Sequence, residues 1–127
     1  MKKVIALFAS VLLLTGCSTS SSTNNLSVTE FSSKTAESGV VTLDVRTPGE
    51  FNEGHVEGAQ LIDFQSGNFE NEIATLDKSK TYAVYCRSGS RSGQAVKVMS
   101  DAGFTSVYNL NGGVIDWTIA GLPLVNN

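Results

Sequence analysis

One strand–loop–helix stretch constrains the fold more than any other part of the chain. The apolar, aromatic-rich run at residues 81–85 predicts a buried strand, and a short polar loop follows it directly. Beyond the loop, apolar residues recur at the i, i+3, i+4, i+7 spacing of an amphipathic helix, namely Ala95, Val98, Met99 and Ala102. A buried strand that leads straight into a helix is one unit of a parallel α/β sheet.

The loop between them, residues 86–92, begins with a cysteine. Cys86 stands where free backbone N–H groups and the positive end of the helix dipole converge on a negative charge. Gly89 lets the loop turn its amides inward, and Arg87 and Arg91 add full positive charges. We therefore predict that Cys86 is a nucleophile handling anions, and that the next five residues bind substrate: Arg87, Ser88, Gly89, Ser90 and Arg91. A buried structural cysteine in an ordinary turn is the alternative.

The rest of the chain alternates strand and helix patterns in the same way. Ser27 and Glu30 have the spacing of a capping box ahead of a first helix. The predicted elements are helix 28–37, strand 40–44, a short helix from Pro48, strand 60–62, helix 68–76, strand 106–110 and a short helix around a core Trp117. We expect an α/β fold with a central, mostly parallel sheet and helices on both faces.

Charged residues follow the predicted strand 40–44. Because ligands of parallel sheets bind beyond the carboxyl ends of the strands, Asp44 and Cys86 should share one edge of the sheet. We interpret Asp44, Arg46 and Glu50 mainly as a network of ion pairs and hydrogen bonds that shapes this edge. Direct contact with the substrate is the alternative role.

His55 is the only histidine in the chain. A zinc site is not expected, because zinc needs several nitrogen or sulfur ligands. We expect a hydrogen-bonded structural histidine, and the alternative is a catalytic base for Cys86.

The amino terminus starts with Met-Lys-Lys and continues as an apolar run over residues 4–14. This run is shorter than the roughly 20 residues of a membrane-spanning helix and fits a secretory signal. It ends in Leu-Thr-Gly-Cys at residues 14–17, which resembles the bacterial lipoprotein processing box. The resemblance implies removal of residues 1–16 and a lipid on Cys17. It also implies an exported, membrane-anchored lipoprotein whose domain faces the periplasm or the cell exterior, with an ordinary signal peptide as the alternative.

Beyond this segment we expect a flexible polar tether at residues 17–25 and one domain with one core at residues 26–127. Removing the signal leaves seven basic residues against twelve acidic ones, a net charge of −5. Such acidity argues against nucleic-acid binding, which needs clustered Lys and Arg. Two of the seven cations lie within five residues of Cys86, which favours a small anionic substrate. With Cys17 lipidated, Cys86 would be the only free thiol.

Three motifs in order resemble those of rhodanese-type sulfurtransferase domains. The first lies in residues 43–59 and contains Leu-Asp-Val-Arg and Gly-His-Val-Glu-Gly-Ala. The second, at residues 85–92, is the cysteine loop with the tyrosine before it, and the third, at residues 109–123, contains Asn-Leu-Asn-Gly-Gly and Gly-Leu-Pro. The ordered set covers residues 27–124. One departure is Asp63, where many members of the family have a proline.

The resemblance implies a rhodanese-like three-layer fold and a persulfide mechanism at Cys86. The cysteine would take a sulfane sulfur from thiosulfate or a similar donor and pass it to cyanide or a thiol. The planar guanidinium groups of Arg87 and Arg91 suit a small dianion, because each can bind two oxygens at once. No metal or organic cofactor is implied.

Two other functions compete with this interpretation. A cysteine phosphatase or arsenate reductase uses a similar loop, but of the pattern C-x5-R, and here Ser92 occupies the arginine position while Arg91 gives C-x4-R. A persulfide carrier without turnover, or a binding module, is the second alternative. A carrier would share the first half of the reaction, so turnover separates it from an enzyme.

Overall fold

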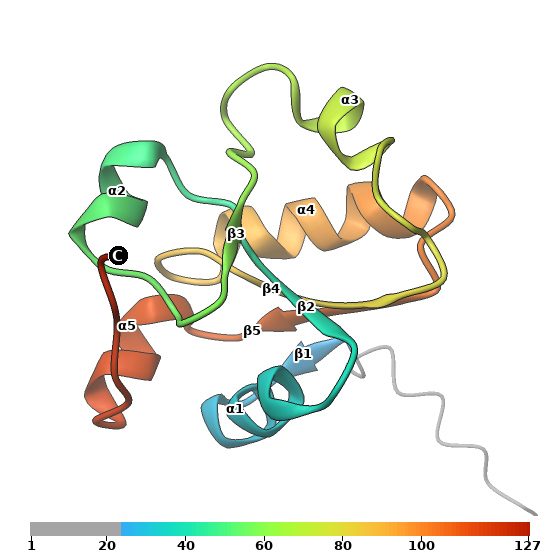
Figure 1. Ribbon diagram of the computed structural model, residues 1–127. Helices are drawn as coiled ribbons and strands as arrows, with labels where there is room; N and C mark the ends of the chain where they lie inside the picture. The colour runs from blue at the N-terminus through green and yellow to red at the C-terminus, as the bar shows by residue number, and fades with distance from the viewer. Residues whose placement is uncertain (1–23) are drawn as a thin grey trace, which may run out of the picture.

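The computed structural model describes residues 24–127 (Figure 1). In chain order the elements are β1 (Asn25–Leu26), α1 (Val28–Ala36), β2 (Val40–Asp44), α2 (Pro48–Glu53), β3 (Gln60–Leu61), α3 (Phe69–Ile73), β4 (Thr81–Tyr85), α4 (Ser90–Asp101), β5 (Ser106–Leu110) and α5 (Gly113–Ile119). Each strand and helix predicted from sequence periodicity is present, with shifts at some ends.

The five strands form one parallel sheet in the order β1-β5-β4-β2-β3. β4 lies at its centre, and both edge strands are only two residues long. The register pairs Asp44, the last residue of β2, with Tyr85, the last residue of β4. The residues that follow these two strands therefore emerge side by side, as predicted for Asp44 and Cys86.

Helices cover both faces of the sheet and give three layers (Figure 1). On one face α3 and α4 pack over a cluster that includes Leu43, Val84 and Met99. On the other face α1 and α5 pack through Phe31 and Trp117, whose rings meet edge to face at 6.3 Å between centroids. Burial of these apolar side chains on both faces stabilises the sheet. The predicted α/β fold is confirmed.

The helix starts follow from local capping chemistry. Ser27 caps α1 and Thr47 caps α2, each in a reciprocal capping box with the glutamate three residues later, Glu30 or Glu50. Pro48 occupies the first turn of α2, where its missing N–H needs no partner.

The domain begins slightly earlier than predicted. Asn25, which we assigned to the tether, pairs with Asn109 in β1, and the Asn24 side chain donates to the Val107 carbonyl at 3.0 Å. The polar composition of this stretch concealed the strand, because its only buried residue is Leu26. Helix α3 is also shorter than the predicted 68–76, since Leu76 reaches the core from the turn that follows.

Cys17 and the rest of the predicted signal and tether through residue 23 lie outside the described residues, so their processing stays a prediction. Within residues 24–127, no helix is both long and apolar enough to cross a membrane.

Candidate active site

The candidate site is the loop that joins β4 to α4. Cys86 follows the last residue of β4 directly, and its side chain is fully buried. Gly89 is the residue before α4 and has a φ of 95°, a left-handed conformation that favours glycine. This turn brings the backbone of the loop back over the sulfur, as the sequence of the loop predicted.

Hydrogen-bond donors from the loop and from α4 surround the Cys86 sulfur. The Gly89 amide donates to Sγ at 3.1 Å, and the Ser92 hydroxyl donates to Sγ at 3.2 Å. Ser92 is fully buried in the first turn of α4. The role of Ser92 was not predicted, although the residue lies in the predicted loop. The position of Ser92 could have indicated this role, because a polar residue in the first turn of a helix can face the preceding loop.

These donors control the ionisation of Cys86. Burial acts to raise the pKa of the Cys86 thiol, since a thiolate is poorly solvated there. The Ser92 hydroxyl and the amides of Ser92, Gly89 and Ser88 together outweigh burial, and the pKa lies below its ordinary value. Local hydrogen bonding therefore favours the reactive thiolate.

The two loop arginines have different environments. Arg91 binds Glu50 through two parallel hydrogen bonds, Nη1 to Oε1 at 2.7 Å and Nη2 to Oε2 at 2.9 Å. The bond to Arg91 lowers the pKa of Glu50 to about 2, so the carboxylate stays charged at neutral pH. Arg87 is exposed, and its guanidinium forms no hydrogen bond or ion pair with the described part of the chain. Arg87 is thus the loop arginine that is open to a ligand.

Asp44 and Arg46 form a second pair, separate from Glu50. Both are buried, and Arg46 Nη2 lies 2.6 Å from Asp44 Oδ2. The Tyr85 hydroxyl donates to the same oxygen at 2.7 Å and accepts from the Val56 amide at 3.0 Å. Burial raises the pKa of Tyr85, and the Asp44 charge raises it further. Since a buried tyrosine hydroxyl needs a partner, Tyr85 in an apolar strand was the available sign of this network.

The first turn of α5 binds the backbone of the cysteine loop. The Val114 amide donates to the Cys86 carbonyl at 2.9 Å, and the Ile115 amide donates to the Arg87 carbonyl at 3.1 Å. Gly113, at a φ of 58°, lies so close that a Cβ there would overlap the Arg87 carbonyl. With their carbonyls bound by α5, the residues of the loop can present their amides to the sulfur. Gly112 and Gly113 belong to the third sequence motif, but their role in supporting the loop was not predicted.

His55 has structural contacts. Its Nδ1 lies 2.9 Å from the Phe51 carbonyl oxygen, and its ring stacks on the Phe51 ring at 3.7 Å between centroids. Its backbone forms a bridge with Val125. These contacts account for the buried histidine as part of the packing between α2 and the carboxyl-terminal segment.

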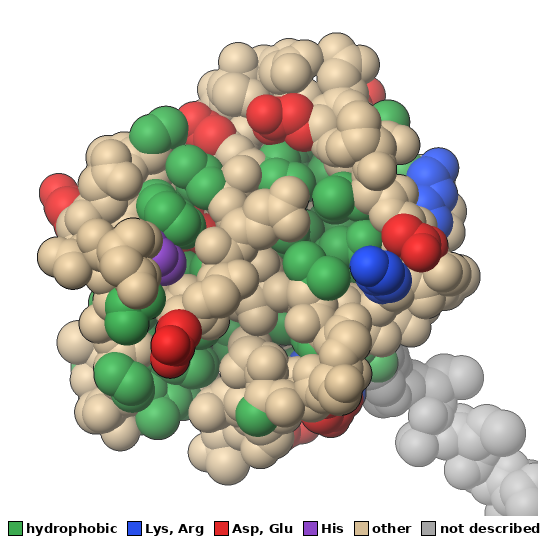
Figure 2. Space-filling view, in the orientation of Figure 1, with side chains coloured by type: hydrophobic (Ala, Val, Ile, Leu, Met, Phe, Trp, Pro, Cys, Tyr) green, Lys and Arg blue, Asp and Glu red, His purple; other side chains and the backbone are tan. Residues whose placement is uncertain are grey.

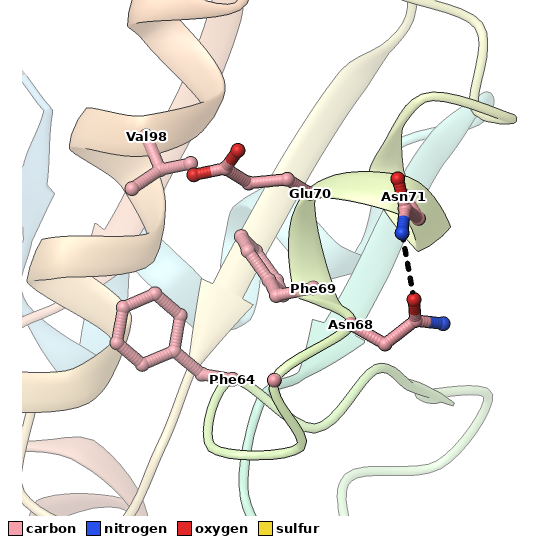
Figure 3. Close-up of a pocket in the computed structure, with 7 residues that line it drawn as sticks. Phe64, Asn68, Phe69, Glu70, Asn71 and Val98 are labelled. Atoms are coloured by element: carbon pink, nitrogen blue, oxygen red, sulfur yellow. Dashed lines mark hydrogen bonds between the residues drawn. The ribbon is translucent and has the colours of Figure 1, made fainter.

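A groove of about 480 Å³ lies between α2 and α5, beside the cysteine loop. It is lined by Arg46, Glu50, Glu53, Arg87, Val114, Ile115, Thr118 and Ile119. A different hollow, of about 450 Å³, lies between α3 and α4, where Glu70 extends toward Val98 and Asn71 bonds to Asn68 (Figure 3). That hollow takes no residue from the cysteine loop, whereas the groove beside α5 includes Arg87 of that loop.

The lowered pKa of Cys86 leads to a prediction about reactivity. Alkylation by a small neutral reagent should persist as pH falls from about 8.5, where a free thiol titrates, toward 7. Ser92→Ala should move the midpoint to higher pH, because it removes the hydroxyl that bonds to the sulfur. Ser90→Ala is the matched control, since Ser90 is exposed and makes no side-chain contact with Sγ. A wild-type midpoint at or above that of a free thiol would show that burial outweighs the hydrogen bonds.

The chain is similar, in sequence and in structure, to known domains of one family. Residues 27–120 match the family described as the rhodanese-like domain. The thiosulfate sulfurtransferase GlpE of Shewanella oneidensis is 32% identical over 97 residues, which cover 76% of this chain and 94% of that protein. The crystal structure of a rhodanese-related protein from Thermoplasma volcanium matches with a TM-score of 0.72 and 27% identity, over 82% of this chain and 99% of that one.

Some relatives are much longer than this chain. The probable adenylyltransferase/sulfurtransferase MoeZ of Mycobacterium tuberculosis is 37% identical over 75 residues, which cover 59% of this chain. The match spans only 19% of MoeZ. The similarity there is confined to one part of a larger protein.

Proposed function

The chain belongs to the rhodanese-like domain family, and on that premise we propose that it transfers a sulfane sulfur from thiosulfate to cyanide or a thiol through a Cys86 persulfide. The observation that carries the proposal is the pair of donors on the Cys86 sulfur, the Gly89 amide and the Ser92 hydroxyl. They favour a thiolate, which is the form that attacks sulfur.

In the first step the Cys86 thiolate attacks the outer sulfur of thiosulfate. A bond forms between the two sulfurs, the S–S bond of thiosulfate breaks, and sulfite leaves with the electron pair. The persulfide that remains on Cys86 is also an anion at neutral pH. Donors that stabilise the thiolate are therefore placed to stabilise the product of this step as well.

In the second step cyanide or a thiolate attacks the outer sulfur of the persulfide. The new bond takes that sulfur to the acceptor, and the bond to Cys86 breaks with its electron pair returning to the cysteine. No proton has to be removed from an ionised acceptor. This chemistry does not require His55 as a base. The His55 ring instead bonds to the Phe51 carbonyl and stacks on the Phe51 ring.

Intact mass after incubation with thiosulfate tests the proposal. The protein should gain the mass of one sulfur atom, and cyanide should remove it and yield thiocyanate. Loading without repeated turnover would indicate a persulfide carrier. Protein that gains no sulfur, together with hydrolysis of an aryl phosphate, would contradict sulfur transfer and favour a cysteine phosphatase.

The exposed, unpaired guanidinium of Arg87 predicts a role for this residue in binding thiosulfate, the sulfur donor. Arg87→Ala should lower kcat/KM for thiosulfate by about tenfold to a hundredfold, because one charge-assisted contact contributes about 1.5–3 kcal/mol. The double variant Arg91→Ala with Glu50→Ala removes a pair without net charge and should lose less activity. Near-normal thiosulfate kinetics in Arg87→Ala would mean that the loop amides bind the donor alone.

We also propose that the domain is anchored to a membrane through Cys17, as its resemblance to a lipoprotein processing box implies. The mature protein should lack residues 1–16, carry a lipid and sediment with membranes. Cys17→Ala should remain without lipid. Wild-type protein that is found unprocessed in the cytoplasm would contradict this anchoring.

A further inference from the structure

The groove between α2 and α5 has an apolar wall that the transfer of sulfur to cyanide does not need. Among residues 24–127, the exposed large hydrophobic side chains are Ile115 and Ile119, with 43% and 79% of their surface accessible. They are four residues apart, on one face of α5, and both line the groove. Apolar side chains gather on the side of the molecule that carries α2 and α5 (Figure 2).

This apolar wall is joined to the cysteine loop by backbone hydrogen bonds. Val114 and Ile115 line the groove, and their amides bind the carbonyls of Cys86 and Arg87. A molecule lying along α5 would therefore have one end at the loop. The groove holds about 480 Å³, which is in the range of small-molecule sites, about 300–1,000 Å³, and far more than cyanide fills.

The groove is lined by both paired and unpaired charged groups. Arg46 is paired with Asp44, and Glu50 is paired with Arg91. Two charged groups that line the groove form no hydrogen bond or ion pair among residues 24–127: Arg87 and Glu53. Arg87 belongs to the cysteine loop, and Glu53 lies at the far end of α2, one turn beyond Glu50. The groove thus has an unpaired positive charge on the cysteine loop and an unpaired negative charge at the end of α2.

We propose that this groove binds the sulfur acceptor, and that the acceptor is a thiol with an aliphatic body and a cationic outer end. Its thiolate would lie near Arg87, its carbon chain against Ile115 and Ile119, and its positive group near Glu53. This inference rests on the proposed function and specifies the acceptor. The thiolate attacks the outer persulfide sulfur, the new S–S bond forms, and Cys86 leaves as a thiolate, so no oxidant or reductant is needed.

The test uses protein loaded with sulfur from thiosulfate and freed of excess donor. Four thiols are compared at equal thiolate concentration: mercaptopropanol, mercaptohexanol, aminohexanethiol and mercaptohexanoate. Mercaptohexanol should react about tenfold faster than mercaptopropanol, because its additional CH₂ groups leave water along α5. Aminohexanethiol should react several-fold faster than mercaptohexanoate, because only the amine is attracted to Glu53.

Variants assign each preference to its residues. The double variant Ile115→Ser with Ile119→Ser should lose the chain-length preference, and Glu53→Gln should lose the preference for the amine. Both should unload normally with cyanide, which is too small to contact these side chains while it attacks the persulfide. Glu57→Gln is the matched control, because Glu57 is exposed but does not line the groove.

The outcomes separate this inference from the proposed function. If cyanide cannot unload the protein, sulfur transfer itself is wrong. If cyanide unloads it but the thiols show no dependence on chain length or charge, the acceptor assignment is overturned. It is also overturned if sedimentation shows a dimer that the isoleucine double variant abolishes, because a second copy of the chain would then cover α5.

Discussion

Cys86→Ser is expected to abolish sulfur transfer, with turnover falling by roughly a thousandfold or more. The serine hydroxyl is not ionised at neutral pH and cannot form a persulfide. Cys86 is the free cysteine of the described residues, so within them no second thiol can take over. The donors from Gly89 and Ser92 can still bond to the smaller oxygen, so the loop should keep its conformation.

The measurement is thiocyanate production from thiosulfate and cyanide, together with intact mass. The variant should gain no sulfur and unfold at a temperature close to that of the wild type. Ser92→Ala is the useful comparison, since it keeps the thiol and should retain measurable turnover. Wild-type rates in Cys86→Ser would place the chemistry at another residue.

Gly113→Ala is expected to lower kcat/KM by about a hundredfold, although residue 113 contacts neither the substrate nor the Cys86 sulfur. A Cβ at this position would overlap the Arg87 carbonyl, and the φ of 58° is unfavourable for alanine. The loop must shift to make room, which disturbs the bonds from Val114 and Ile115 to the loop carbonyls. A displacement of about 1 Å in a positioned group can reduce a rate by about a hundredfold.

Gly49→Ala is the matched control. Gly49 is in α2, has no positive φ, and a Cβ there meets nothing within 4 Å. It should keep full activity and gain slightly in stability, because alanine favours the helix. If Gly113→Ala acts on the loop rather than on the whole fold, the pH midpoint of Cys86 alkylation should rise while most of the protein stays folded. Unchanged kinetics would show that the loop keeps its shape without this close contact.

The sequence predicted the fold well because its signals are local and periodic. The helical spacing after the cysteine loop predicted the buried face of α4, and the β-branched run predicted the buried strand β2. The loop at Cys86 was likewise identified from neighbouring residues, as was the capping box at Ser27. A two-residue strand such as β1 carries no periodicity, and its pairing with β5 depends on residues 84 positions away.

The parts of the site that escaped prediction are contacts between distant segments. Spacing alone does not show that Glu50 pairs with Arg91, 41 residues away, rather than with nearby Arg46. From its sequence neighbours, Gly113 is predicted only to be a turn residue. The packing of α5 against the cysteine loop shows that the absence of a side chain there allows close contact with the Arg87 carbonyl. The bond of Ser92 to the sulfur depends on a turn whose shape appears only once the loop is folded.

The short strands at both margins of the sheet limit how this protein can associate. An uncovered strand edge can recruit a strand from another chain, and longer edges make such growth easier. Here β1 offers only Asn25 and Leu26, and β3 only Gln60 and Leu61. Crowding many copies together would therefore give their sheets little opportunity to join edge to edge into fibrils.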